Sequence, residues 1–244
     1  TFRLAAGFGG HHNVMYLDAT LRPIGQFLSR SWLGLAYGAI LISTYFVTTS
    51  LSEAQWDSLS QTISTNMSNM EHHPVMVLIA SALVADGSIV LWTTMTVILL
   101  IVLQRWIGAK WALLFAFLGN TIPTLITMAS INYGLAVGWY DQSIRTTDDY
   151  GVSYVVATLL GMVFWRIPNL AWRAVYLALG IAWLSTMGLF QVPENFTALG
   201  HVTGYMIGLG FGAIAAKYLA RPSLRQAKLA VDQESSGMRD YQNA

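Results

Sequence analysis

The sequence predicts an all-α membrane protein with six transmembrane helices and both termini on the cytoplasmic side. Composition is the first observation behind this prediction: 55% of the 244 residues are hydrophobic and only 10% are charged, whereas soluble domains average about 25% charged residues. Six apolar stretches are the second observation, because a helix needs about 20 apolar residues to cross a bilayer. The third is the placement of the basic residues in the connecting segments, which predicts the orientation.

Most of the apolar stretches are bounded by polar residues or prolines. The second stops at Gln104-Arg105, the fifth at Pro193 and the sixth before Pro222. Pro123 within the third predicts a kink, because proline removes a helix hydrogen bond. The predicted spans cover residues 31–49, 88–103, 111–131, 151–165, 174–192 and 197–219.

An apolar run also precedes the second span, so that residues 74–103 form one continuous stretch. A single helix of that length would measure about 45 Å, which exceeds the hydrocarbon core of about 30 Å. Asp86-Gly87 in its middle predicts a turn. We therefore expect residues 74–85 to be a separate membrane-associated segment within a long first outside segment, residues 50–87.

The charged residues predict which side each connecting segment occupies. Twelve of the 13 basic residues fall on one side of the six-span arrangement, and Arg145 is the exception. Because basic residues are retained in the cytoplasm, residues 1–30 are predicted to be a cytoplasmic N-terminal segment. Residues 31–219 form the transmembrane domain, and residues 220–244 a cytoplasmic tail. The chain begins at Thr1, and we expect further residues upstream.

The composition disfavours several classes of function. No Asp, Glu, Lys or Arg lies in the middle of a predicted span, which argues against ion-coupled transporters and proton pumps. The chain has no cysteine, and its net charge of +1 provides no basic patch for nucleic acid. The doublets His11-His12 and His72-His73 are poor metal sites, because neighbouring side chains point apart. We expect no metal, no cofactor and no nucleic-acid partner.

Two residues that could carry chemistry lie near the outside ends of two spans. Ser153 opens the fourth span, and His201 lies near the start of the sixth. A serine becomes a nucleophile when a base lies within about 3 Å. The alternative is that Ser153 is an ordinary first-turn residue and that His201 only hydrogen-bonds a neighbour.

Small residues in the same two spans predict that they pack closely. Glycines recur every four residues along the sixth span, next to His201, and small residues at this spacing let helix backbones approach each other. The predicted packing residues are Gly200, Gly204, Gly208 and Gly212, with Gly161 of the fourth span as their counterpart.

This layout resembles the rhomboid superfamily of intramembrane serine proteases over residues 31–219. The shared features are six spans, a long first outside segment, a Gly-x-Ser opening the short fourth span, and a histidine followed by regular glycines in the sixth. The chain is most similar to divergent actinobacterial rhomboid-like membrane proteins, through Ser64-Thr65-Asn66, His73-Pro74 and Ser81-Ala82-Leu83. The resemblance implies a bacterial plasma-membrane protein in which Ser153 is the nucleophile and His201 the base.

The sequence departs from the protease pattern around this pair. Tyr154 stands where the proteases usually have a second glycine, and their oxyanion-holding His and Asn of the second helix fall on Val90 and Thr94. Valine cannot donate a hydrogen bond, so Thr94 is the oxyanion candidate, and backbone N–H groups near Ser153 could also serve. Losing one oxyanion donor costs about 10²–10³ in rate. The Trp-Arg motif that is typical of the first outside segment in the proteases is also absent from residues 50–87, although Trp56 lies there.

Two functions therefore remain open. The first is a catalytically degenerate protein, a pseudoprotease, that lies in the bilayer and binds other integral membrane proteins as an accessory or scaffold subunit of a larger complex. The glycine-rich face of the later spans, the first outside segment and exposed residues such as Met67 and Trp139 would contact those partners. The alternative is an intramembrane serine protease that uses a Ser153–His201 dyad.

Overall fold

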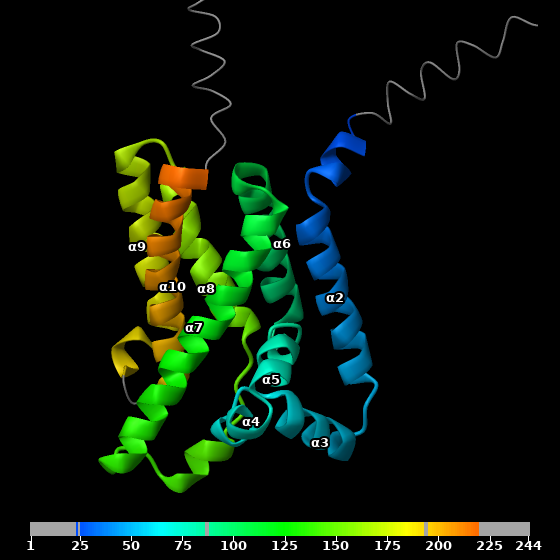
Figure 1. Cartoon of the computed structure of the whole chain (residues 1–244), viewed down its shortest axis with the longest axis vertical. Helices are drawn as coiled ribbons and strands as arrows, with labels where there is room; N and C mark the ends of the chain where they lie inside the picture. The colour runs from blue at the N-terminus through cyan, green and yellow to red at the C-terminus, as the bar shows by residue number, and fades with distance from the viewer. Residues whose placement is uncertain (1–22, 24, 86–87, 193–194, 220–244) are drawn as a thin grey trace, which may run out of the picture.

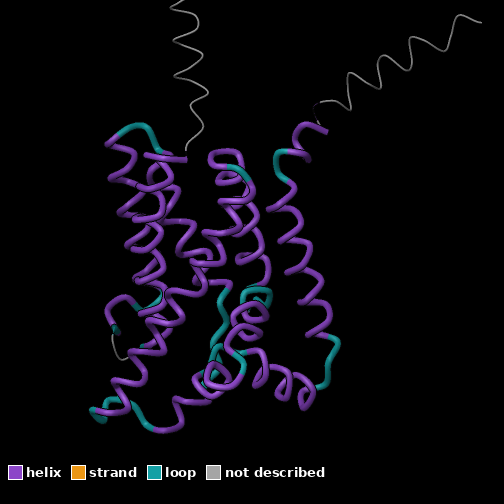
Figure 2. The backbone as a smooth tube through the Cα atoms, viewed as in Figure 1, coloured by secondary structure: helices purple, strands orange, loops and turns teal. Residues whose placement is uncertain are grey.

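The computed structural model describes residues 23, 25–85, 88–192 and 195–219, and within these residues every regular element is helical. Figure 2 shows helices joined by short loops. Most of the predicted N-terminal segment, the turn at Asp86-Gly87, the stop at Pro193 and the predicted tail lie outside the described residues.

Four helices are long and apolar enough to cross a membrane, and two shorter apolar helices accompany them. The long ones are α2 (Trp32–Thr49), α6 (Ile89–Ile107), α7 (Ala109–Ala136) and α10 (Phe196–Ile214), which continues into the π-helical turn η4 (Ala215–Leu219). The shorter ones are α8 (Val152–Val163), extended by the 3-10 turn η2 (Phe164–Arg166), and α9 (Leu170–Thr186). These six helices overlap the six predicted spans in chain order. That all six cross the membrane remains a prediction.

Helix α9 begins and ends earlier than predicted. The Asn169 side chain caps it by accepting hydrogen bonds from the backbone N–H groups of Ala171 at 2.8 Å and Trp172 at 3.3 Å, as a polar N-cap does. Gly188, with φ of 92°, follows the helix end, and Leu189–Gln191 forms the 3-10 turn η3. The apolar pattern alone missed this cap, so the predicted span of residues 174–192 was displaced.

The first outside segment contains three short helices, α3 (Glu53–Ile63), α4 (Met67–His72) and α5 (Pro74–Ser81). Helix α5 ends at Ser81 and α6 begins at Ile89, so the long apolar run is divided as expected. Met67 is not exposed as predicted, because it belongs to a small core with Met128, Ile131 and Phe196. Trp139 is exposed and packs edge-on against Tyr133.

Buried hydrogen bonds tie helix α5 to the bundle. The Asn120 side chain of α7 donates to the Leu78 carbonyl at 2.8 Å, and the Gly151 N–H donates to the Ser81 carbonyl at 3.2 Å. The Tyr37 hydroxyl of α2 donates to the Ala82 carbonyl just beyond α5. Backbone polar groups within a membrane need such partners, so these bonds fix the apolar segment against three neighbouring elements.

Helix α8 is the central helix of the bundle, and 10 of its 12 residues are buried. Figure 1 shows α8 between α7 and α10, with α9 beside α10 at the edge of the bundle. In contrast to α8, only Leu184 of the 17 residues in α9 is buried. The start of α2 and the end of α10 lie at the same end of the bundle, and α3, α4 and α5 gather at the other (Figure 1). This arrangement fits an even number of crossings.

Candidate functional site

The glycines of α10 face α8. A Cβ placed on Gly208 would lie closer than 3.0 Å to the backbone of Thr158, and one on Gly212 would lie 2.7 Å from the Met162 carbonyl. A Cβ on Gly161 of α8 would lie 2.8 Å from the Leu209 nitrogen. Gly204 likewise lies against α8, with Thr158 Oγ1 at 3.2 Å from an added Cβ. This face is occupied within the chain, so the expectation that it contacts partner proteins is wrong.

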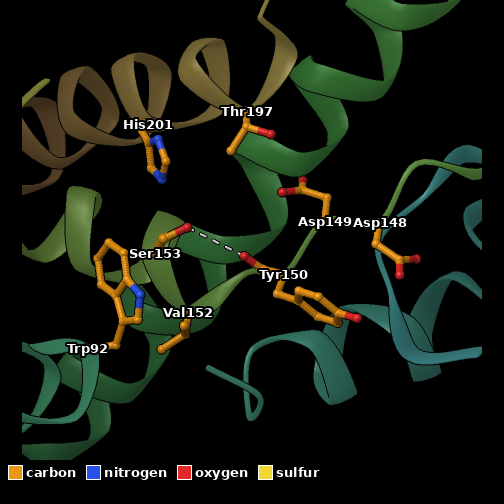
Figure 3. A pocket seen from close by; sticks show the side chains of 8 residues that line it. All are labelled: Trp92, Asp148, Asp149, Tyr150, Val152, Ser153, Thr197 and His201. Atoms are coloured by element: carbon orange, nitrogen blue, oxygen red, sulfur yellow. Dashed lines mark hydrogen bonds between the residues drawn. The ribbon is translucent and has the colours of Figure 1, made fainter. Parts of the chain in front are cut away.

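Close approach of α8 and α10 brings Ser153 and His201 to one pocket. The pocket has a volume of about 190 Å³ and lies beside the first turns of α8 and α10. Figure 3 shows both side chains pointing into it, one from each helix. Eight residues line it: Trp92, Asp148, Asp149, Tyr150, Val152, Ser153, Thr197 and His201.

The Ser153 hydroxyl is hydrogen-bonded to the backbone and not to His201. It donates a hydrogen bond of 3.4 Å to the Tyr150 carbonyl, one turn earlier in the chain, and this bond is dashed in Figure 3. Only 9% of Ser153 is exposed. Within the described part of the chain, no hydrogen bond joins the serine to the histidine. The two residues therefore share one pocket without a hydrogen bond between their side chains.

His201 is buried without a hydrogen-bond partner on either ring nitrogen, and only 4% of the residue is exposed. Two aromatic rings surround it edge-on, Tyr154 at 5.3 Å and Trp183 at 5.8 Å between ring centroids. Buried polar groups usually have a partner. An imidazole in this environment is available to a group that enters the pocket.

Tyr154 fills the space between α8 and α10 next to the histidine. It is fully buried, and a Cβ on Gly200 would collide with its ring. Its hydroxyl donates a hydrogen bond of 2.8 Å to the Asp149 carboxylate. Tyr154, which stands where the proteases usually have a second glycine, is thus held by packing of its ring against α10 and by the hydrogen bond from its hydroxyl to a carboxylate.

Asp149 also joins the pocket to the first outside segment. Its backbone N–H donates to the Ser64 hydroxyl at 2.7 Å, and its carbonyl accepts from the Thr65 N–H at 2.9 Å. The Thr65 hydroxyl donates to that carbonyl at 3.0 Å and lies 3.3 Å from the carboxylate. All three residues are buried. This makes Ser64-Thr65, singled out above for the family resemblance, a direct support of the site.

Two further contacts join the first outside segment to a second one, residues 132–150, which connects the third and fourth predicted spans. The Trp56 ring of α3 stacks on Tyr150 of the pocket, with 6.2 Å between centroids. Arg145 and Glu71 form an ion pair of 2.5 Å between partly exposed side chains. Arg145, the one basic residue predicted on the outer side, is thus paired with an acidic residue of the first outside segment.

The structure does not bring Thr94 to the pocket. Thr94 and Val90 both lie on the exposed face of α6, whereas Trp92 lines the pocket and Thr93 is buried. Adjacent helix positions differ by about 100° in direction, so a residue two positions after Trp92 lies on nearly the opposite face of α6. Thr94 is therefore not positioned to hold an oxyanion.

Sequence reasoning missed the other six residues that line the pocket, which are Trp92, Asp148, Asp149, Tyr150, Val152 and Thr197. Of these, only Asp148 and Asp149 carried a signal, as acidic residues just before an apolar helix. Their proximity depends on contacts between elements far apart in the sequence.

Apolar helices of membrane-spanning length around a buried polar pocket define an integral membrane protein. A family model described as "Rhomboid-like protein" matches residues 30–218. The chain therefore belongs to the rhomboid-like family, within the rhomboid superfamily. Searches of curated proteins and of solved structures found no match.

Proposed function

We propose that this chain is a catalytically degenerate rhomboid-like protein that binds other integral membrane proteins, as an accessory or scaffold subunit of a larger complex. It would reside in a bacterial plasma membrane, with six crossings and both termini cytoplasmic. The observation that carries the proposal is the position of Tyr154, which occupies the space beside His201 and is anchored on Asp149.

The surroundings of the pair lack what acyl transfer requires. A nucleophilic serine needs a hydrogen bond to its base, and the Ser153 hydroxyl donates instead to the Tyr150 carbonyl. The developing oxyanion needs preorganised donors, and Val90 and Thr94 lie on the exposed face of α6. A pocket with these features keeps the fold of the family while it loses the groups that make the reaction fast.

Helix α9 is the element we propose to contact a partner. One face of it packs on the bundle, through Tyr176, Gly180 and Trp183 and through Leu184, its one buried residue. Apolar side chains elsewhere on it are exposed, including Leu170 at 79% and Leu179 at 64%. Helices associate within membranes mainly by packing, and α9 leaves most of its surface free for a second transmembrane helix.

A photocrosslinking amino acid at Leu179 is expected to yield discrete adducts with other membrane proteins in cells, because this side chain points away from the bundle. The matched control is the same amino acid at Leu184, which is 5% exposed and should crosslink only within the chain. Gel electrophoresis and mass spectrometry of the purified protein would identify the adducts. Adducts with lipid alone at Leu179 would contradict the proposal.

Labelling by a fluorophosphonate is expected to be absent, because Ser153 has no aligned base. The purified protein in nanodiscs would be compared with Ser153→Ala and His201→Ala, and an active serine hydrolase would serve as the positive control. Labelling of the parent that both substitutions abolish would disprove degeneracy and would establish the second candidate.

That second candidate is an intramembrane serine protease. It is favoured by the shared pocket and by the unpartnered ring nitrogens of His201, since catalytic hydrogen bonds are often long before substrate binds. In that case Ser153 Oγ would attack a peptide carbonyl and pass its proton to His201. The histidine would give this proton to the leaving amine as the peptide C–N bond breaks. The resulting acyl-enzyme would then be hydrolysed by water activated by the same histidine.

A further inference from the structure

We propose that Asp149 is a positioning residue that holds Tyr154 against His201 and so couples the first outside segment to access at Ser153. The inference rests on pocket geometry and is independent of whether the pair is catalytic. It concerns a residue outside the Ser–His pair, placed by its hydrogen bonds.

The first step is the bond between Asp149 and Tyr154. The tyrosine hydroxyl donates to the carboxylate at 2.8 Å, and neither residue is more than 5% exposed. A hydrogen bond to a charged group is stronger than one between neutral groups, particularly when water is excluded. The carboxylate therefore fixes the far end of a side chain whose ring faces His201.

The second step is the position of the tyrosine relative to Ser153. The two residues are neighbours in the first turns of α8, and the Tyr154 ring lies between Gly200 and His201 of the facing helix. When the hydroxyl loses its anchor, the ring gains freedom to move from this position. Space beside His201 then opens to molecules that reach Ser153.

The third step links this anchor to the first outside segment. Thr65 contacts both the carbonyl and the carboxylate of Asp149 through its hydroxyl, at 3.0 and 3.3 Å. Ser64 adds a bond to the backbone N–H. Displacement of Ser64-Thr65 would move Asp149, and with it the contact that holds Tyr154.

The chain has no cysteine, so a single introduced thiol reports on access without background. We would measure the rate at which N-ethylmaleimide, a neutral reagent, modifies Ser153→Cys in nanodiscs. Asp149→Asn and Tyr154→Phe are each expected to raise this rate about tenfold, the factor that corresponds to one hydrogen bond to a charged group. The double variant should exceed the faster single variant by no more than about twofold, because both changes break the same bond.

Matched controls separate positioning from charge and from folding. Asp57→Asn removes the same charge from an exposed residue of α3 that does not line the pocket, and should leave the rate unchanged. Thr65→Val should raise the rate about threefold or more, because it removes hydrogen bonds that position Asp149 but leaves the Asp149–Tyr154 bond itself. Thr62→Val is the matched control, because Thr62 is exposed on α3, and it should leave the rate unchanged. Ser58→Cys, also exposed on α3, monitors the reagent itself.

Thermal unfolding of every variant accompanies the rates. If Asp149→Asn does not fold, Tyr154→Phe carries the test, because it removes one oxygen and keeps the ring. Rates of the folded variants that stay within about twofold of the parent would overturn the proposal. So would an equal effect of Asp57→Asn, or independent effects of Asp149→Asn and Tyr154→Phe that multiply in the double variant.

Discussion

Replacing Gly208 with alanine is expected to destabilise the bundle by about 3 kcal/mol, near the upper end of the range for inserting atoms into a well-packed core. An added Cβ would lie closer than 3.0 Å to the carbonyl carbon and oxygen of Thr158. Backbone atoms of a central helix cannot rotate away as a side chain can, so α8 and α10 would have to separate. Thermal unfolding in detergent would measure the loss.

Gly210 provides the matched control on the same helix. An added Cβ there meets nothing within 4 Å, so Gly210→Ala should leave stability unchanged or raise it by up to about 1 kcal/mol through helix propensity. An equal loss of stability in both variants would mean that any glycine replacement in α10 has the same effect. The close approach of α8 and α10 would then no longer explain why Ser153 and His201 lie in one pocket.

The order of the helices could be predicted from the sequence because hydrophobic length determines which segments can cross a bilayer. The approach of Ser153 to His201 in one pocket could also be predicted from local features of two helices. A glycine every fourth residue marks the contact face of α10, and the position of each residue near its helix start gives similar depth. Both signals are local and can be read from one segment at a time.

The rotational setting of α6 could not be predicted in this way. Residues 89–103 are apolar on every side apart from a few threonines, and a helix that is hydrophobic all round has no face that its sequence identifies. Thr94 was therefore assigned to the pocket, although Trp92 occupies that direction. The Asp149–Thr65 contact spans 84 residues and depends on the folded arrangement of the two outside segments.

Tyr154→Ala is expected to lower stability by about 4–6 kcal/mol, because it deletes a fully buried aromatic ring and a hydrogen bond to a carboxylate. Tyr154→Phe should cost only about 1.5–3 kcal/mol, since it removes the hydroxyl alone. The difference between the two variants measures the ring that packs on Gly200 and His201. Chemical or thermal unfolding in the same detergent would provide both values.

The size of that ring contribution bears directly on function. A glycine at this position would leave the space beside His201 open, whereas a tyrosine makes the same space part of the hydrophobic core. If Tyr154→Ala proved nearly as stable as the parent protein, the ring would be a loosely held cover that could yield to a substrate, and the protease would become the stronger candidate. A large loss would mean that the fold depends on keeping the space filled, which leaves little room for a substrate next to the histidine.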